Sequence, residues 1–328
     1  MPPPADTSGH DLLAEALAGL RGVPRTLPCA LLYDEAGAAL FDEISRLPQY
    51  YVTRTEVSIL HQHLDLICDA IGPDAVLIEL GSGSAIKTEV LLERLLQRGL
   101  PPRAYCPLDI SLEQLAEVSG RLRRRFPTLE ILPSGVDYTR MATLPADVAA
   151  ALGEPGSRAV AYFPGSTIGN FHPGEAGRFL RRLGDLLGSG GRLVVGYDRY
   201  KDRGVLLPAY DDQQGVTARF NLNLLSRLQR DFEAELEPRV WRHEARWVDP
   251  WDAGWGRIEM HLVAQRATRI QIAGQTFDFG RGETIWTESS YKHERHGFDQ
   301  LLRQAGFRGV GCWSDPKEWF TVQAAQRD

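Results

Sequence analysis

The sequence predicts an α/β fold, in which a parallel sheet flanked by helices is joined to a second α+β lobe. Between about Glu56 and Tyr200, short apolar runs rich in β-formers alternate with longer helical patterns, which is typical of βαβ units. After Tyr200 this alternation stops. With 328 residues, the chain is also longer than a single hydrophobic core usually serves, so two lobes are expected.

The elements of the first lobe follow from the spacing of apolar residues and from turn residues between them. Short apolar runs predict strands at Ala75–Leu80, Ala104–Leu108, Ile131–Leu132, Ala159–Phe163 and Arg192–Gly196. Leucines and other apolar residues at helical spacing predict helices at Lys87–Gln97, Leu112–Arg125 and Gly174–Leu187. Strand and helix therefore alternate in a Rossmann-like order.

The second lobe begins with a helical stretch at Val216–Glu235, followed by alternating strands between Val240 and Trp286. The tail from Phe298 to Phe320 returns to a helix and then a strand, so we expect it to complete the first sheet. The resulting domains are 55–200 plus 293–328 for the sheet and 1–54 plus 201–292 for the second lobe.

Composition narrows the class of partner. The net charge of −6 does not favour a nucleic-acid partner, which usually requires a basic surface. The sequence contains no apolar run of the roughly 20 residues needed to cross a bilayer, and Met1–His10 lacks the pattern of a secretory signal. We therefore expect a monomer that works without nucleic acid or membrane.

Cysteine and histidine spacing give no metal site. The four cysteines are far apart and contain no CxxC pair, which favours reduced thiols and a cytoplasmic location. His293 and His296 are spaced to share a helix face, but no third ligand is evident, so we expect a solvated pair and no bound metal.

A glycine turn follows the first predicted strand. The segment Gly81–Thr88 reads GSGSAIKT, and such a turn allows backbone N–H groups to approach a ligand. It resembles a Walker loop, but Ile86 occupies the position of the second glycine. The strand at Ala159–Phe163 is also followed by Pro-Gly-Ser and not by the acid that holds magnesium in nucleotide hydrolases. A dinucleotide fingerprint likewise requires glycine at position 86.

The pattern that fits is the one for S-adenosylmethionine. It needs an acidic strand end, a Gly-x-Gly turn and a carboxylate after the second strand, and the sequence supplies Glu79, Gly81, Gly83 and Asp109. Asp137-Tyr138 follows the third strand, where an acid and an aromatic ring can hold adenine. Asp109 has an alternative explanation as a helix N-cap, because a helix begins just after it.

Two further blocks identify a family. With the glycine turn, Phe163–Asn170 (FPGSTIGN) and Tyr210–Thr217 (YDDQQGVT) resemble the histidine-specific methyltransferase family of the ergothioneine pathway. The resemblance extends from about Leu27 to Phe320. Other matching blocks are Tyr33-Asp34, Leu40–Asp42, Leu47–Tyr51, Arg257–Met260 and Trp286–Lys292.

The resemblance implies a Rossmann-like class I methyltransferase domain and a substrate-binding lobe. S-adenosylmethionine is the implied co-substrate, and L-histidine is the implied acceptor, converted stepwise at its α-amine to trimethylhistidine (hercynine). Two rivals remain: an N-methyltransferase for another amino acid or an indole compound, and a non-catalytic S-adenosylmethionine-binding regulator.

The resemblance also implies a role for individual residues of the substrate site. Asn170 and Tyr210 correspond to the residues that hold the substrate carboxylate, although Asn170 can also be explained as a cap of the helix after Pro173. Glu288 and Ser290 correspond to the imidazole-reading pair, two residues apart on a strand. Met260 and Thr217 are implied neighbours of the substrate.

The remaining implied residues surround the amine and the cofactor. Tyr33, Phe41 and Tyr50 match the aromatic positions that enclose the amine and ring, where cation–π contacts retain methylammonium groups. Tyr33 and Gly165 are the implied catalytic positions: the phenol orients the amine, and the glycine lets the backbone approach it. Implied cofactor-binding residues are Gly81, Gly83, Lys87, Asp109, Asp137 and Tyr138.

Overall fold

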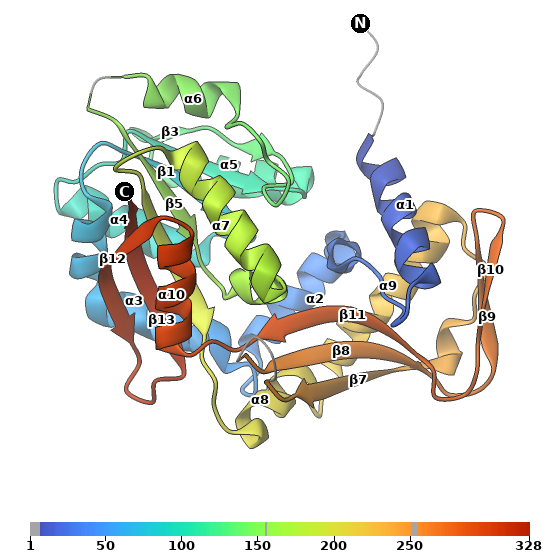
Figure 1. Ribbon diagram of the computed structural model, residues 1–328. Coiled ribbons are helices and arrows are strands. Elements are labelled where there is room, and N and C mark those ends of the chain that lie inside the picture. Colours follow the sequence, from blue (N-terminus) through green and yellow to red (C-terminus); the bar gives the residue numbers. More distant parts are fainter. Residues whose placement is uncertain (1–6, 155, 251–254) are drawn as a thin grey trace, which may run out of the picture. The chain divides into compact units, whose positions relative to one another are not determined.

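The computed structural model describes residues 7–154, 156–250 and 255–328 (Figure 1). The first six residues of the N-terminal segment interpreted above therefore lie outside the described part. The described residues form two compact units, each of which is built from separate segments of the chain. Unit 1 contains residues 7–51, 201–250 and 256–290, and unit 2 contains residues 52–154, 156–200, 255 and 291–328.

Unit 2 is built on one mixed sheet, and the prediction of a Rossmann-like sheet is confirmed. Its strands are β1 (Ala75–Leu80), β2 (Ala104–Asp109), β3 (Glu130–Ile131), β4 (Ser134–Gly135), β5 (Arg158–Phe163), β6 (Arg192–Asp198), β12 (Phe307–Ser314) and β13 (Phe320–Arg327). The strand order is β12-β13-β6-β5-β1-β2-β3, and β4 pairs with β2. Strand β13 runs antiparallel to β6 and β12. The tail of the chain therefore completes the sheet, as expected.

The third predicted strand of this sheet is not formed as a single strand. Instead of a continuous Ile131–Leu132 strand, the structure has two short strands on either side of Leu132 and Pro133. Proline lacks the N–H that a ladder requires, so it interrupts the pairing with β2.

Helices cover both faces of this sheet. They are α3 (Tyr51–Ile71), α4 (Ile86–Gln97), α5 (Leu112–Arg125), α6 (Ala146–Leu152), η2 (Thr167–Asn170), α7 (Pro173–Leu187) and α10 (Arg295–Gln304). Val76, Ile78 and Leu80 share a core with apolar residues of α7 and α10, which lie on the near face in Figure 1. Side chains alternate along a strand, so Leu77 and Glu79 point to the opposite face.

The strand order reverses next to β1, which has β2 on one side and β5 on the other. Ligands in open α/β sheets bind outside the carboxyl ends of the strands at such a switch point. The segments that leave these ends are the glycine turn after β1, the residues after β2 and the loop after β5. The fold therefore brings Gly81, Asp109 and Gly165 to the same edge of the sheet.

Unit 1 is an α+β assembly, as predicted. Its strands form a three-stranded sheet of β11 (Thr284–Tyr291), β8 (Arg257–Ala264) and β7 (Trp241–Val248), and a hairpin of β9 (Thr268–Ile272) and β10 (Gln275–Phe279). Its helices are α1 (Thr7–Arg21), η1 (Cys29–Leu32), α2 (Glu35–Arg46), α8 (Arg203–Tyr210), α9 (Val216–Phe232) and η3 (Pro238–Val240). The predicted helix at Val216–Glu235 ends earlier because Glu233 adopts a left-handed conformation with φ of 53°.

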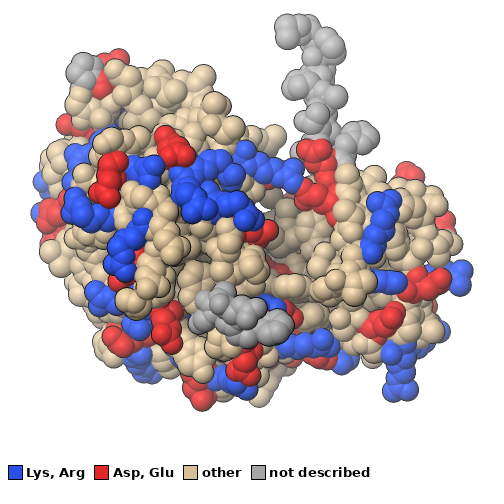
Figure 2. Space-filling view, in the orientation of Figure 1, with Lys and Arg blue, Asp and Glu red and all other residues tan. Residues whose placement is uncertain are grey.

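Three further features of the structure concern the charges on the surface, the cysteines and the length of the apolar helices. Basic and acidic side chains both occur across the face seen in Figure 2. Cys29, Cys68, Cys106 and Cys312 are free thiols, and burial raises the pKa of Cys68 to about 11. Within the described ranges, no helix combines the length and the apolar character needed to cross a membrane.

Candidate active site

The turn after β1 depends on two glycines. Gly81 has φ of 73° and Gly83 has φ of 46°, which L side chains adopt only with strain. A β carbon on Gly81 would lie 3.3 Å from the hydroxyl of Tyr138. The turn therefore leaves its backbone accessible and lies directly against one of the predicted cofactor-binding residues.

Asp109 ends β2 and holds the same turn. Its Oδ2 accepts the N–H of Gly83 at 3.0 Å, and its Oδ1 accepts the N–H of Ser111 at 3.0 Å. The N-cap of α5 is Ser111, whose hydroxyl accepts the N–H of Gln114. The helix thus has its own cap, and Asp109 faces the glycine turn.

Asp137 and Tyr138 lie in the loop after β4. The Asp137 carboxylate accepts the N–H of Thr139 at 2.9 Å, and its side chain remains 44% exposed. The Tyr138 ring makes edge contacts with Phe163 and Phe179, with centroids 5.8 and 6.3 Å apart. Tyr138 therefore forms a fixed aromatic wall beside the glycine turn.

Lys87, in the first turn of α4, has a buried acidic partner that sequence reasoning missed. Its Nζ lies 2.6 Å from Oε2 of Glu56, a residue of α3 that is 1% exposed. The backbone N–H of Gly165 donates to the same carboxylate, at 2.9 Å to Oε2 and 3.1 Å to Oε1. Glu56 thus connects a predicted cofactor-binding residue to a predicted catalytic glycine.

Glu79, the acidic end of β1, is buried beneath the turn. Oγ1 of Thr88 donates to its carboxylate, at 2.7 and 2.8 Å from the two oxygens, and the hydroxyl of Tyr105 donates to Oε2. Burial raises the pKa of Glu79 to about 7, although both hydrogen bonds oppose the rise. Glu79 therefore supports the turn from inside the protein.

In unit 1, aromatic residues predicted to enclose the substrate form one connected cluster. The Tyr33 ring meets Phe41 edge-on at 5.9 Å, Phe41 meets Tyr50 at 6.0 Å, and Tyr50 meets Tyr210 at 6.1 Å. Phe220 of α9 joins the cluster through Tyr33, at 5.5 Å. Such edge-on contacts are favourable and orient the rings.

The polar residues predicted to read imidazole join this cluster. The hydroxyl of Tyr33 donates to Oε1 of Glu288 at 3.3 Å, and the hydroxyls of Tyr210 and Ser290 lie 2.8 Å apart. Met260 is 2% exposed in β8, and the N–H of Thr217 donates to Asp212 at 2.8 Å. Phenols, a hydroxyl and a carboxylate therefore lie among aromatic rings.

Two predicted site residues, Gly165 and Asn170, belong to unit 2. Asn170 is the last residue of η2, in the loop between β5 and α7. The N-cap of α7 is His172, whose Nδ1 accepts the N–H of Gly174 at 3.3 Å. Asn170 is therefore not the cap of that helix.

The prediction that His293 and His296 form a solvated pair is wrong. His293 precedes α10 and is fully buried, with its ring edge-on to Trp255 at 4.5 Å and to Phe298 at 5.1 Å. Burial lowers the pKa of His293 to about 3, so the ring is neutral. Only His296 of the two is exposed.

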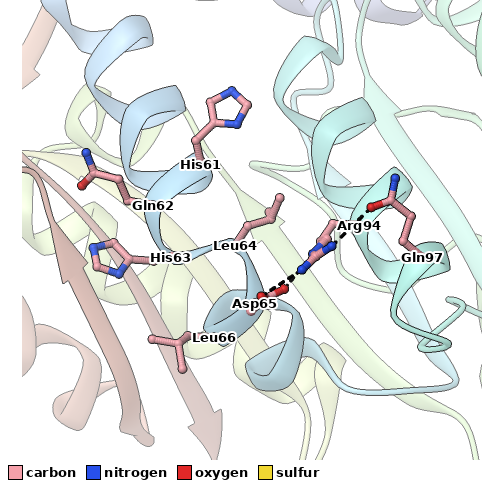
Figure 3. Close-up of a pocket in the computed structure, with 8 residues that line it drawn as sticks. All are labelled: His61, Gln62, His63, Leu64, Asp65, Leu66, Arg94 and Gln97. Carbon is pink, nitrogen blue, oxygen red and sulfur yellow. Dashed lines mark hydrogen bonds and ion pairs between the residues drawn. The ribbon is translucent and has the colours of Figure 1, made fainter.

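A separate surface pocket lies where α3 bends at His63 (Figure 3). Its volume is about 350 Å³, and it is lined by residues 61–66 of α3 together with Arg94 and Gln97 of α4. Asp65 and Arg94 form an ion pair across it at 2.7 Å. The predicted site residues lie elsewhere, so this pocket is not the candidate active site.

Comparison with known proteins identifies relatives along almost the whole chain. A family model described as histidine-specific, SAM-dependent methyltransferase matches residues 12–327. The histidine N-alpha-methyltransferase of Mycolicibacterium smegmatis is 36% identical over 98% of this chain and 97% of that protein. The ergothioneine biosynthesis protein 1 of Neurospora crassa is 29% identical over 90% of this chain and 32% of that protein.

Among solved structures, similarity is found to an S-adenosylmethionine-dependent methyltransferase from Clostridium acetobutylicum. The two chains are 9% identical, and the alignment covers 88% of this chain and 97% of that one with a TM-score of 0.46.

Proposed function

The chain belongs to the histidine-specific, S-adenosylmethionine-dependent methyltransferase family, and from this premise we propose that it methylates the α-amine of L-histidine, stepwise to hercynine, in ergothioneine biosynthesis. The observation that carries the proposal is the pairing of Tyr33 with Glu288 and of Tyr210 with Ser290 inside one aromatic cluster. Imidazole presents one N–H donor and one nitrogen acceptor. A carboxylate accepts the N–H, and a hydroxyl donates to the other nitrogen. An indole ring has only the N–H, so the hydroxyl would be left without a partner.

On the donor side, unit 2 supplies groups that suit S-adenosylmethionine. The two glycines with positive φ leave space for the methionine part beside the backbone, and Lys87 offers a cation for its carboxylate. We assign the ribose hydroxyls to Asp109 and the adenine to Asp137 and Tyr138. S-adenosylmethionine supplies a methyl group on a sulfonium, which is electrophilic without help from a metal.

On the acceptor side, we assign the imidazole to Glu288, Ser290 and Met260, and the carboxylate to Asn170 and Tyr210, with Thr217 as a neighbour. Tyr33, Phe41 and Tyr50 surround the amine and its methylated forms. An aromatic enclosure stabilises a methylammonium through cation–π contacts, so partly methylated substrate is retained for the next transfer.

The reaction requires a neutral amine nitrogen aligned with the methyl carbon. Before each transfer the ammonium form of the amine loses a proton to solvent; the N–C bond then forms as the C–S bond breaks, and S-adenosylhomocysteine leaves. The protein contributes alignment, which accounts for much of the acceleration of such bimolecular steps. We assign orientation of the amine to the Tyr33 hydroxyl and close backbone approach to Gly165.

Each lobe has its own task in this reaction. We take 55–200 plus 293–328 as the methyltransferase domain and 1–54 plus 201–292 as the substrate-binding domain. We further propose a monomer that acts on a small molecule in the cytoplasm, without nucleic acid or membrane. The four free cysteines support the cytoplasmic location, and the net charge of −6 supports the absence of a nucleic-acid partner.

The test is production of S-adenosylhomocysteine from S-adenosylmethionine with a panel of free amino acids. We expect turnover with histidine and at most a small fraction of that rate with tryptophan. Preferred turnover of tryptophan would assign the protein to indole substrates. Cofactor binding without turnover of any amino acid would identify a regulator and contradict the proposal.

A further inference from the structure

A buried polar network lies behind the residues assigned to imidazole, and we propose that Asn221, His243 and Thr287 are positioning residues that set the affinity for histidine. The inference rests on the proposed function and adds residues that do not themselves touch the substrate. All three are buried, with exposed fractions of 0%, 8% and 2%. They come from α9, β7 and β11 of unit 1.

Asn221 is the centre of the network. Its Nδ2 donates to Nδ1 of His243 at 2.9 Å and to the carbonyl of His261 at 3.1 Å, and its Oδ1 accepts from Thr287 at 2.7 Å. Both amide protons and the oxygen are therefore used. A flipped amide would place its oxygen against the His261 carbonyl, so only one orientation satisfies the network.

His243 connects the amide to Tyr210. Its Nε2 lies 2.8 Å from the Tyr210 carbonyl and must donate there, while Nδ1 accepts from Asn221. The ring is thus held as the neutral Nε2–H tautomer. Burial lowers the pKa of His243, although the nearby acids Asp211, Asp212 and Glu244 oppose this.

Thr287 connects the amide to the sheet. Its hydroxyl lies 2.7 Å from Oδ1 of Asn221 and 3.0 Å from the carbonyl of Met260, so its one proton is shared between them. Thr287 directly precedes Glu288, and Met260 is the assigned apolar neighbour of the imidazole. The network therefore fixes backbone at Tyr210, Met260 and the residue next to Glu288.

This arrangement explains how the imidazole-reading groups hold their positions. Hydrogen bonds to a ligand lose strength when donor and acceptor shift by a fraction of an ångström, so a site requires rigid support behind it. The network supplies that support from three elements at once. Its loss should weaken histidine binding and leave the cofactor residues of unit 2 unaffected.

The first test is Thr287→Val, which keeps the shape of the side chain and removes the hydroxyl. We expect the Kd for histidine, measured by calorimetry, to rise about tenfold, as the loss of one buried hydrogen bond near a site implies. The Kd for S-adenosylhomocysteine should stay within about twofold. Thr276→Val is the matched control, because Thr276 is an exposed strand threonine of the same unit.

The second test is Asn221→Asp, which changes a donor into an acceptor at His243. Neutral His243 then faces a carboxylate without a proton between them, whereas protonated His243 donates to it. We expect the ratio of variant Kd to wild-type Kd for histidine to be large near pH 8.5 and to fall severalfold near pH 6.5. Comparison at each pH cancels the titration of the substrate itself.

The outcomes separate this inference from the proposed function. If the wild-type protein does not bind histidine, the proposed function fails. If the wild-type protein binds histidine, two results would overturn the positioning role. Either both variants bind histidine as tightly as wild type does, or they weaken binding of S-adenosylhomocysteine as much as binding of histidine. A pH-independent ratio for Asn221→Asp would overturn it as well, because general damage to the fold does not follow the protonation of His243.

Discussion

The ammonium of Lys87 lies 2.6 Å from the carboxylate of Glu56, which is 1% exposed and also accepts the N–H of Gly165. Three segments of unit 2 therefore meet at one buried acid. The Lys87 side chain is 18% exposed, so its ammonium can reach water, whereas the Glu56 carboxylate cannot. The two charges therefore differ in exposure, and removal of the lysine should lower the free energy of unfolding more than removal of the acid.

We expect Lys87→Met to lower the free energy of unfolding by about 3 kcal/mol at neutral pH, because it leaves a buried carboxylate without a cation. Glu56→Gln should cost less, since its amide oxygen still accepts from Gly165. The double variant should resemble Glu56→Gln alone. Urea unfolding of the four proteins gives the coupling energy.

The ion pair of Arg266 and Glu237 is a matched control for this double-mutant cycle. Its Nη2 and Oε2 atoms also lie 2.6 Å apart, but the two side chains are 64% and 56% exposed. Its coupling energy should stay below about 1 kcal/mol, because water screens both charges. Additive losses at Glu56 and Lys87 would mean that the buried pair does not act as a unit.

Glu79 should make stability depend on pH. Its pKa is raised from 4.5 to about 7, mainly by burial, so the folded protein binds the proton more tightly than the unfolded chain does. Stability from this group is thus complete below about pH 4.5 and is lost as pH rises through about 7, by about 3 kcal/mol in total.

Glu79→Gln should remove this slope, and urea unfolding at pH 5 and pH 8 measures it. Glu93→Gln is the control, because that carboxylate on α4 is 48% exposed and should leave the slope unchanged. An identical slope in wild type and Glu79→Gln would show that Glu79 is ionised across the whole range.

Asp109→Asn should weaken binding of the cofactor. An amide keeps one acceptor for the Gly83 N–H but loses the charge that strengthens hydrogen bonds to ribose hydroxyls, so the Kd for S-adenosylhomocysteine should rise at least about tenfold. Calorimetry measures the change. Asp147→Asn, at an exposed position of α6, is the control and should have no effect. Equal affinities in wild type and Asp109→Asn would remove Asp109 from the cofactor site.

Glu288→Gln should weaken binding of histidine. The substitution keeps the size of the side chain, but an amide accepts a ring N–H less strongly than a carboxylate, so the KM for histidine should rise at least about tenfold. The KM for S-adenosylmethionine should not change. Glu237→Gln serves as the control at an exposed glutamate of the same unit. A rise in both KM values would indicate a structural role for Glu288.

Local pattern was sufficient for the regular elements. Strand β1 and helix α5 have the predicted bounds because buried alternation, leucine spacing and the cap at Ser111 are all encoded within a few residues. The third strand, predicted at Ile131–Leu132, ends at Ile131, and pairing with β2 resumes only after Pro133, whose lack of an N–H is a local signal.

The supporting residues could not be predicted in the same way. Glu56 is 31 residues from Lys87 and 109 from Gly165, and Asn221 is 66 residues from Thr287. Each is an ordinary polar residue in a helix until the fold supplies its partners. His293 was misjudged for a related reason, because its burial depends on Trp255 and Phe298, which only tertiary packing brings to it.

The most direct test of the central claim is tandem mass spectrometry of histidine after incubation with the protein and methyl-labelled S-adenosylmethionine. The account predicts products with one, two and finally three labelled methyl groups, all on the α-nitrogen. Unlabelled histidine, or label on a ring nitrogen, would contradict it.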